Sequence, residues 1–203
     1  MLTHLRAAVV MLVLFTALTG LAYPLAITGV AQIALPRQSN GTVIQRDGTP
    51  IGSALIGQSF TGDRYFHGRP SATNTPDPKD DTKTIDLPYN AANSSGSNLG
   101  PLSKKLLDRV AADITALRQA GVAKVPADAV TTSASGIDPH MSPASASLQI
   151  QRVASARGVS VHEIGDIMQR QIEMPFLGLF GEPRVNVLQL NIALDAALPK
   201  VAG

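Results

Sequence analysis

A serine, an aspartate and a histidine lie close together in the segment TSASGIDPHMSP. These are the residue types of a serine hydrolase: Ser133 or Ser135 as nucleophile, Asp138 as the orienting acid and His140 as the base. Triad members come from separated parts of a fold, however, and no G-x-S-x-G strand-turn-helix context surrounds either serine. The segment is better interpreted as a structured turn. An anchored extracytoplasmic hydrolase is kept as an alternative function.

The sequence contains neither a complete metal-binding motif nor a phosphate-binding loop. His162 and Glu163 begin an H-E-x-x-H motif, but Asp166 stands where the second histidine belongs. The glycine-containing segments GSALIGQ and GSNLGP lack the G-K-[ST] of a phosphate-binding loop. The chain has no cysteine, which excludes disulfides and thiolate ligands. We therefore expect no catalytic residue, no metal site and no tightly bound cofactor.

One pair of expected helices has the spacing of a DNA-binding helix-turn-helix. Ala154 is followed four residues later by Gly158 and then by an amphipathic segment. The second helix would carry three acidic residues against one arginine, and this balance repels phosphates. The acidic residues are Glu163, Asp166 and Glu173, and the arginine is Arg170. The chain's net charge of +2 is also too even for nucleic acid. We expect core-packing helices and no nucleic-acid partner; a membrane-anchored regulator is the competing interpretation.

The segment from Gly41 to Phe60 has the pattern of a β-hairpin. GTVIQ and IGSALI are apolar runs on either side of an Asp47-Gly48 turn signal. From Gly62 to Gly100 the chain is rich in Pro, Asn, Asp, Ser, Thr and Gly, which predicts a long loop. Within it, residues 73–84 are polar enough for either a functional loop or surface disorder.

Four helices are expected in the second half of the chain. The first spans 101–120, with Pro101 in its first turn and Gly121 after its end. The second runs from the cap Ser142 to Gly158, and the third from Ser160 to Pro175. Residues 186–198 are ambiguous between helix and strand, and their spacing favours helix. The fold class is α+β: one N-terminal transmembrane helix, then a helix-rich mixed soluble domain with a small antiparallel sheet.

The N-terminal segment reads as a membrane anchor. No charged residue lies between Arg6 and Arg37, and about 20 apolar residues suffice to span a bilayer. A cleaved signal peptide has a shorter apolar region and a small-x-small cleavage site. Pro24 is expected to kink the helix or to pack against a partner, and Pro36 to mark its end. We divide the chain into an anchor, residues 1–36, and a soluble domain, residues 37–203. The short N-terminal tail favours a cytoplasmic N-terminus.

Several sequence blocks, in order, resemble the C subunit of the bacterial high-affinity potassium-transporting P-type ATPase, the Kdp system. After the single span these are GSALIGQSF, YFHGRPSA, YNAANSSGSNLGP, VPADAVTTSASGIDPHMSPASA, RVASARG and RVNVLQLNIALD. They cover nearly the whole chain; residues 73–84 are its least family-like part.

The resemblance implies a non-enzymatic accessory subunit of an ATP-driven potassium uptake complex. Its partners would be a channel-like potassium subunit and a P-type ATPase subunit, together with membrane lipid. The family member is described as a catalytic chaperone that raises the ATP affinity of the ATPase subunit. ATP would then be reached only through that subunit. The implied location is the cell inner membrane, single-pass, with the soluble domain periplasmic or extracellular.

The resemblance also nominates site residues. A nucleotide role proposed for the family's glycine-glutamine segment maps to Gln58, although an outward domain would keep Gln58 away from cytoplasmic ATP and favours a structural role. Candidate partner contacts come from the motif blocks and from the anchor. They are Pro24, Arg69, Asn90, Ser97, Asn98 and Asp138.

Overall fold

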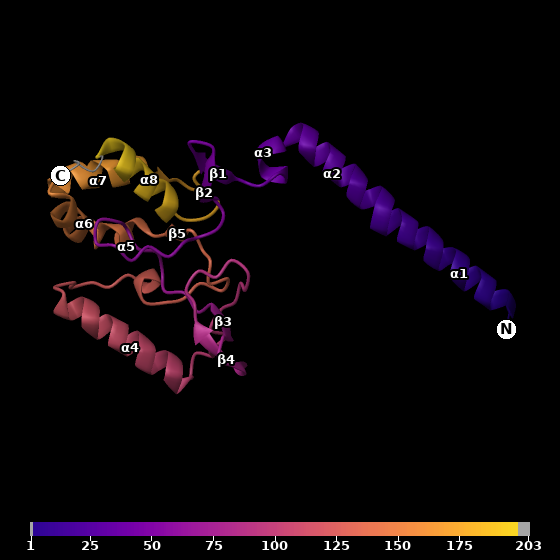
Figure 1. Cartoon of the computed structure of the whole chain (residues 1–203), viewed down its shortest axis with the longest axis horizontal. Coiled ribbons are helices and arrows are strands. Elements are labelled where there is room, and N and C mark those ends of the chain that lie inside the picture. Colours follow the sequence, from indigo (N-terminus) through magenta and orange to yellow (C-terminus); the bar gives the residue numbers. More distant parts are fainter. Residues whose placement is uncertain (1, 199–203) are drawn as a thin grey trace. The chain divides into compact units, whose positions relative to one another are not determined.

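The computed structural model describes residues 2–198, and it divides into two compact units, residues 1–44 and 45–203 (Figure 1). Residue 1 of the predicted anchor and residues 199–203 of the predicted domain lie outside the described residues. The architecture is mixed α+β, with one long apolar helix at the N-terminus and small antiparallel sheets, as predicted.

The N-terminal unit is one long helical rod. It comprises α1 (Leu2–Ala17), the π-helical turn η1 (Leu18–Ala22) and α2 (Tyr23–Ala34). Residues His4–Ala34 are long and apolar enough to cross a membrane. The π turn directly precedes Pro24, which lacks an N–H, and in it the Tyr23 N–H donates to the Leu18 carbonyl. The helix therefore continues past Pro24 through one wider, π-helical turn. It ends at Ala34, and the short helix α3 (Pro36–Ser39) follows.

The predicted first hairpin is confirmed by the strands β1 (Val43–Arg46) and β2 (Thr49–Ser53). Asp47 and Gly48 both have positive φ, 52° and 75°, as a two-residue hairpin turn requires.

The prediction of an unstructured loop from Gly62 to Gly100 is wrong in part. A second hairpin, β3 (Asn74–Asp77) and β4 (Asp80–Asp86), occupies residues 74–86, where the sequence indicated a functional loop or disorder. Apart from Pro76 and Ile85 the residues of both strands are polar, so the sequence has no alternation of apolar side chains that would predict them.

Helix α4 (Lys104–Gln119) begins three residues later than predicted. Pro101 lies in a turn closed by the Ser103 N–H and the Gly100 carbonyl, 3.0 Å apart, and Ser103 is the N-cap. The end is as expected, because Gly121 has a φ of 88° and stops the helix.

The single helix predicted from Ser142 to Gly158 is divided into α5 (Pro143–Ser147) and α6 (Ile150–Arg157). Both predicted caps are present: Ser142 accepts the Ser145 N–H, and Gly158 is left-handed. The break falls at Gln149, whose side-chain amide bonds to both the N–H and the carbonyl of His67, at 2.8 and 2.9 Å. A tertiary contact therefore divides the helix.

Helix α7 (Val161–Arg170) starts at the predicted cap Ser160, which accepts the Glu163 N–H. It ends at Arg170 and not at Pro175, because the next residues form β6 (Ile172–Glu173). The last segment is β7 (Arg184–Asn186) followed by α8 (Val187–Ala197), so the preference for helix there is confirmed and the strand was missed. Strand β7 is central in an antiparallel sheet, between β6 and β5 (His140–Met141).

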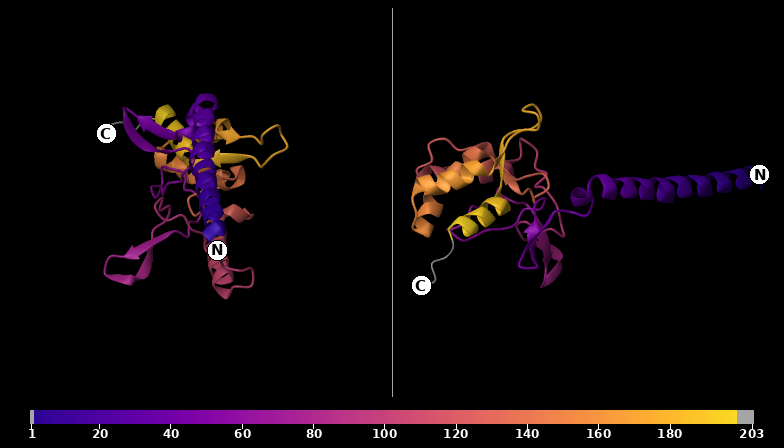
Figure 2. Two further views of the ribbon diagram at one scale, coloured as in Figure 1. Left: turned by 90° about the vertical axis from the view of Figure 1, so that its right-hand side faces the viewer. Right: turned by 90° about the horizontal axis from the view of Figure 1, so that it is seen from above.

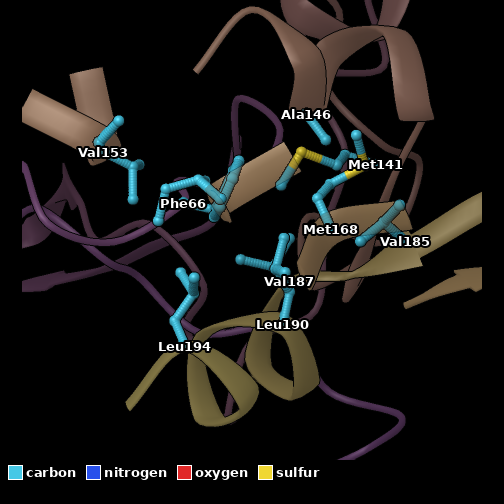
Figure 3. Close-up of a cluster of buried hydrophobic side chains, with 11 residues drawn as sticks. Phe66, Met141, Ala146, Val153, Met168, Val185, Val187, Leu190 and Leu194 are labelled. Carbon is cyan, nitrogen blue, oxygen red and sulfur yellow. The ribbon is translucent and has the colours of Figure 1, made fainter. Parts of the chain in front are cut away.

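The core of the second unit, residues 45–203, consists of side chains from α5 to α8, the small sheet and the segment around Phe66 (Figure 3). Helices α6 and α7 contribute Val153, Ala154, Ile164 and Met168, all buried. They pack as core helices, which leaves Glu163 and Asp166 exposed. Asn191 of α8 is buried in this core and bonds to both the N–H and the carbonyl of Phe66, at 2.8 and 2.9 Å.

Candidate functional site around the Arg69–Asp138 ion pair

Two side-chain amides fix the segment that leads into the site. Asn191 holds the backbone of Phe66, and Gln149 holds that of His67. Buried backbone groups need such partners when no sheet supplies them. The segment is thereby held against α6 and α8, and Arg69 follows two residues later.

Arg69 and Asp138 form an ion pair between two of the sequence motifs. Arg69 Nη1 donates to Asp138 Oδ2 over 3.0 Å, and the two side chains are 23 % and 27 % exposed. Arg69 Nε is buried without a hydrogen-bond partner within residues 2–198. The pair therefore ties the YFHGRPSA segment to the SGIDPH segment, which lie far apart along the chain.

Asp138 also organises the turn that leads into β5. Its Oδ1 accepts the His140 N–H at 3.0 Å and lies 3.6 Å from His140 Nδ1. Burial by itself would raise the pKa of Asp138, but hydrogen bonds from the His140 side chain and backbone, together with the Arg69 charge, lower the pKa below the usual value. Asp138 is therefore held as a carboxylate.

A row of polar side chains continues from this pair to the base of the β6–β7 hairpin. His140 Nε2 lies 3.9 Å from Glu173 Oε2. The same Glu173 oxygen accepts a hydrogen bond from Arg184 Nε at 2.9 Å. The order Arg69, Asp138, His140, Glu173, Arg184 links a loop motif to the small sheet.

Tyr89 packs behind the ion pair and was not predicted as a site residue. Its hydroxyl donates to the Arg69 carbonyl over 2.8 Å. Burial, and then the nearby Asp138 charge, raise the pKa of Tyr89 to about 12. Gly57 and Gly68 border the ring so closely that a Cβ on either would clash with it. The position of Tyr89 in the YNAANSSGSNLGP motif was available in the sequence, but this glycine–tyrosine packing was not.

Asn90 is brought into the same region through a cluster of hydroxyls. The Asn90 N–H donates to Thr73 Oγ1 at 3.0 Å, and Asn90 Nδ2 donates to the Asn74 carbonyl at 2.8 Å. Thr73 Oγ1 in turn donates to the Leu87 carbonyl at 2.6 Å. Asn90 therefore braces the base of the β3–β4 hairpin.

The other predicted contact residues lie elsewhere. Ser97 is half-buried and Asn98 is exposed with a φ of 49°. Across the described residues, no hydrogen bond joins either of them to Arg69, Asn90 or Asp138. Pro24 belongs to the N-terminal unit.

Gln58, the predicted nucleotide contact, has its amide engaged within the domain. Gln58 Nε2 donates to the Ile51 carbonyl at 2.9 Å, and its side chain fills the space beside Gly52. The preceding Gly57 N–H donates to the Ile137 carbonyl at 2.8 Å. These contacts support a structural role for the glycine-glutamine segment.

Ser133 and Ser135, the nucleophiles of the hydrolase hypothesis, accept hydrogen bonds from backbone groups of their own segment. Ser133 Oγ accepts the Gly136 N–H at 2.8 Å, and Ser135 Oγ accepts the Ile137 N–H at 3.3 Å. In the described part of the chain, no hydrogen bond joins His140 to either serine, and no cluster of three or more metal-ligating side chains occurs. The segment is a structured turn, as predicted.

Comparison with known proteins assigns this chain to a family. The family model for KdpC, the c chain of K⁺-transporting ATPases, matches residues 5–196. The chain belongs to the KdpC family. A potassium-transporting ATPase KdpC subunit of Rhodopseudomonas palustris is 55 % identical over 98 % of this chain and 100 % of its own length. The KdpC subunit of Methylobacterium nodulans is 57 % identical over 96 % of this chain and 98 % of its own. KdpC proteins are thus named as a subunit of the ATPase and not as its catalytic chain.

Proposed function

We propose that the chain is a non-catalytic accessory subunit of an ATP-driven potassium uptake complex. It would assemble with a channel-like potassium subunit and a P-type ATPase subunit, stabilise them, and raise the ATP affinity of the ATPase subunit. The family match over residues 5–196 carries this proposal. The geometry is consistent with it, because the polar groups of Gln58, Ser133 and Ser135 are bonded within the domain.

We further propose a single-pass topology in the inner membrane, with a cytoplasmic N-terminus and the soluble domain outside. The apolar helix His4–Ala34 supports the single span, and labelling from each side of the membrane tests the orientation. An outward domain cannot touch cytoplasmic ATP, so its effect on ATP affinity would pass through the membrane-spanning parts. Pro24 and the π turn before it lie where helix contacts would be expected.

The experiment is an ATP titration of the purified ATPase assembled with and without this chain. We expect the ATP concentration for half-maximal hydrolysis to be several-fold lower with the chain present. A Gln58→Ala chain should act like the wild type, because Gln58 bonds to Ile51 and not to nucleotide in this account. An unchanged ATP dependence would refute the affinity role. Loss of the effect in a Gln58→Ala chain that still assembles with the ATPase and unfolds at the wild-type urea midpoint would revive direct nucleotide contact.

A further inference from the structure

The loop between β6 and β7 carries a group of exposed apolar side chains. It projects from the rest of the soluble unit as a narrow hairpin (Figure 2). Its five large apolar residues are between 65 % and 80 % exposed: Met174, Phe176, Leu177, Leu179 and Phe180. We call Met174–Phe180 the apolar tip. Together these side chains present on the order of 600 Å² of apolar surface, at the upper end of what a monomeric protein exposes in one patch.

The apolar tip is an ordered structure. Phe176 and Phe180 form an isolated β-bridge, their rings lie 6.5 Å apart, and each N–H donates to the other's carbonyl, at 3.2 and 3.1 Å. Leu177 has a φ of 54° and Gly178 one of 71°. The left-handed region is unfavourable for leucine, so the backbone conformation of Leu177 is strained while its side chain is exposed to solvent. Hydrogen bonds within the loop hold this turn, with the Gly178 N–H donating to the Pro175 carbonyl at 2.9 Å, so the apolar side chains are presented to solvent by a fixed backbone.

The chemistry of the apolar tip favours a protein partner over a lipid surface. Residues 174–181 include no Trp or Tyr, which are enriched at membrane interfaces, and no Lys or Arg, which are attracted to anionic headgroups. The flanking Glu173 and Glu182 are acidic, which is unfavourable beside anionic headgroups. Apolar anchors inside a polar rim are typical of protein interfaces. Glu182 is exposed and forms no ion pair among residues 2–198.

We propose that the apolar tip docks into an apolar pocket, bordered by a basic residue, on the extramembrane surface of another subunit of the potassium-transporting ATPase. This inference rests on the proposed function, which supplies the partner. Glu173 at the base of this hairpin lies 3.9 Å from His140 and accepts a hydrogen bond from Arg184, so the apolar tip is carried close to the candidate site.

The test uses the double variant Leu177→Asn/Leu179→Ser in the full-length chain. Asparagine tolerates positive φ, so the turn is kept while the apolar surface is removed. The matched control is Leu102→Ser/Leu107→Ser, which removes two exposed leucines, 92 % and 57 % exposed, from the α4 region. Each tagged chain is used to purify the complex, and the partner subunits recovered are quantified. We expect at least a tenfold loss of recovered partner for the tip variant and none for the control.

Photo-cross-linking identifies the occupant directly. A benzophenone amino acid at Leu179 should cross-link to an extramembrane segment of another ATPase subunit, and the same group at Leu102 should not. Cross-links to lipid alone, to a second copy of this chain or to nothing would overturn the docking proposal, as would full recovery of partner by the tip variant. Failure of the wild-type chain to recover partner subunits would instead overturn the proposed function.

Discussion

Replacing Asp138 with alanine tests whether the Arg69–Asp138 pair holds the loop motifs together. The change removes a charge-assisted bond to Arg69 and the bond to the His140 N–H. Hydrogen bonds to charged groups contribute about 1.5–3 kcal/mol each, with the lower value suited to side chains about a quarter exposed. The Arg69 guanidinium, whose Nε has no hydrogen-bond partner among residues 2–198, would also lose its counter-charge. We expect a destabilisation of about 3 kcal/mol.

The assay is urea unfolding of the full-length chain in detergent micelles, followed by far-ultraviolet circular dichroism. At a denaturant slope of about 2 kcal/mol per M, the midpoint should fall by about 1.5 M. The matched control is Asp81→Ala, an exposed aspartate on β4, which should change the stability by less than about 0.5 kcal/mol. If Asp138→Ala shifts the midpoint no more than Asp81→Ala does, the pair does not hold the two motifs.

Three further predictions concern acid stability and packing. Burial would raise the pKa of Asp128, but hydrogen bonds from Ser142 and Ser145 lower it, so like Asp138 it stabilises the fold above the unfolded-state pKa of about 3.9. The urea midpoint should therefore be constant above about pH 5 and fall as the pH drops through the lower folded-state pKa values; Asp138→Asn should flatten that fall, and an unchanged midpoint at acid pH would contradict this. Gly57→Ala would place a Cβ 2.6 Å from the Tyr89 ring and 2.7 Å from the Asp138 carbonyl, and should destabilise by about 1–3 kcal/mol in the same assay. Leu194→Ala removes a fully buried side chain and should lower the unfolding free energy by about 2–5 kcal/mol, whereas a value near zero would contradict the described core.

The sequence predicted the elements whose signals are local. The long apolar run, the Asp47-Gly48 turn, the Ser160 cap and the left-handed Gly158 each depend on neighbouring residues alone, and all are present. One of the errors arises where a tertiary contact bears on the structure. The Gln149 amide breaks a helix because it bonds to His67, which lies far away in the chain.

The sequence shows the motifs that contain Arg69, Asn90 and Asp138 but not their arrangement, and their role as partner contacts stays a prediction. Arg69, Asn90 and Asp138 stand in recognisable motifs, and the structure brings them into one region. The role of Tyr89 depends on two glycines that leave room for its ring, and that complementarity has no linear signature. The β3–β4 hairpin was missed for a related reason: its exposed strands carry no apolar pattern, and Asn90 and Asn93 brace its base through the Asn74 carbonyl.

The orientation of the soluble domain is tested most directly by cysteine labelling in cells that produce the whole complex. The chain has no cysteine, so Lys79→Cys at the exposed tip of the β3–β4 hairpin introduces a single thiol, and His4→Cys does so at the other end of the membrane helix. A membrane-impermeant thiol reagent should label Lys79→Cys in intact cells and His4→Cys only after lysis. Labelling of Lys79→Cys only after lysis would contradict the outward domain and would return Gln58 to the side of the membrane where ATP is found.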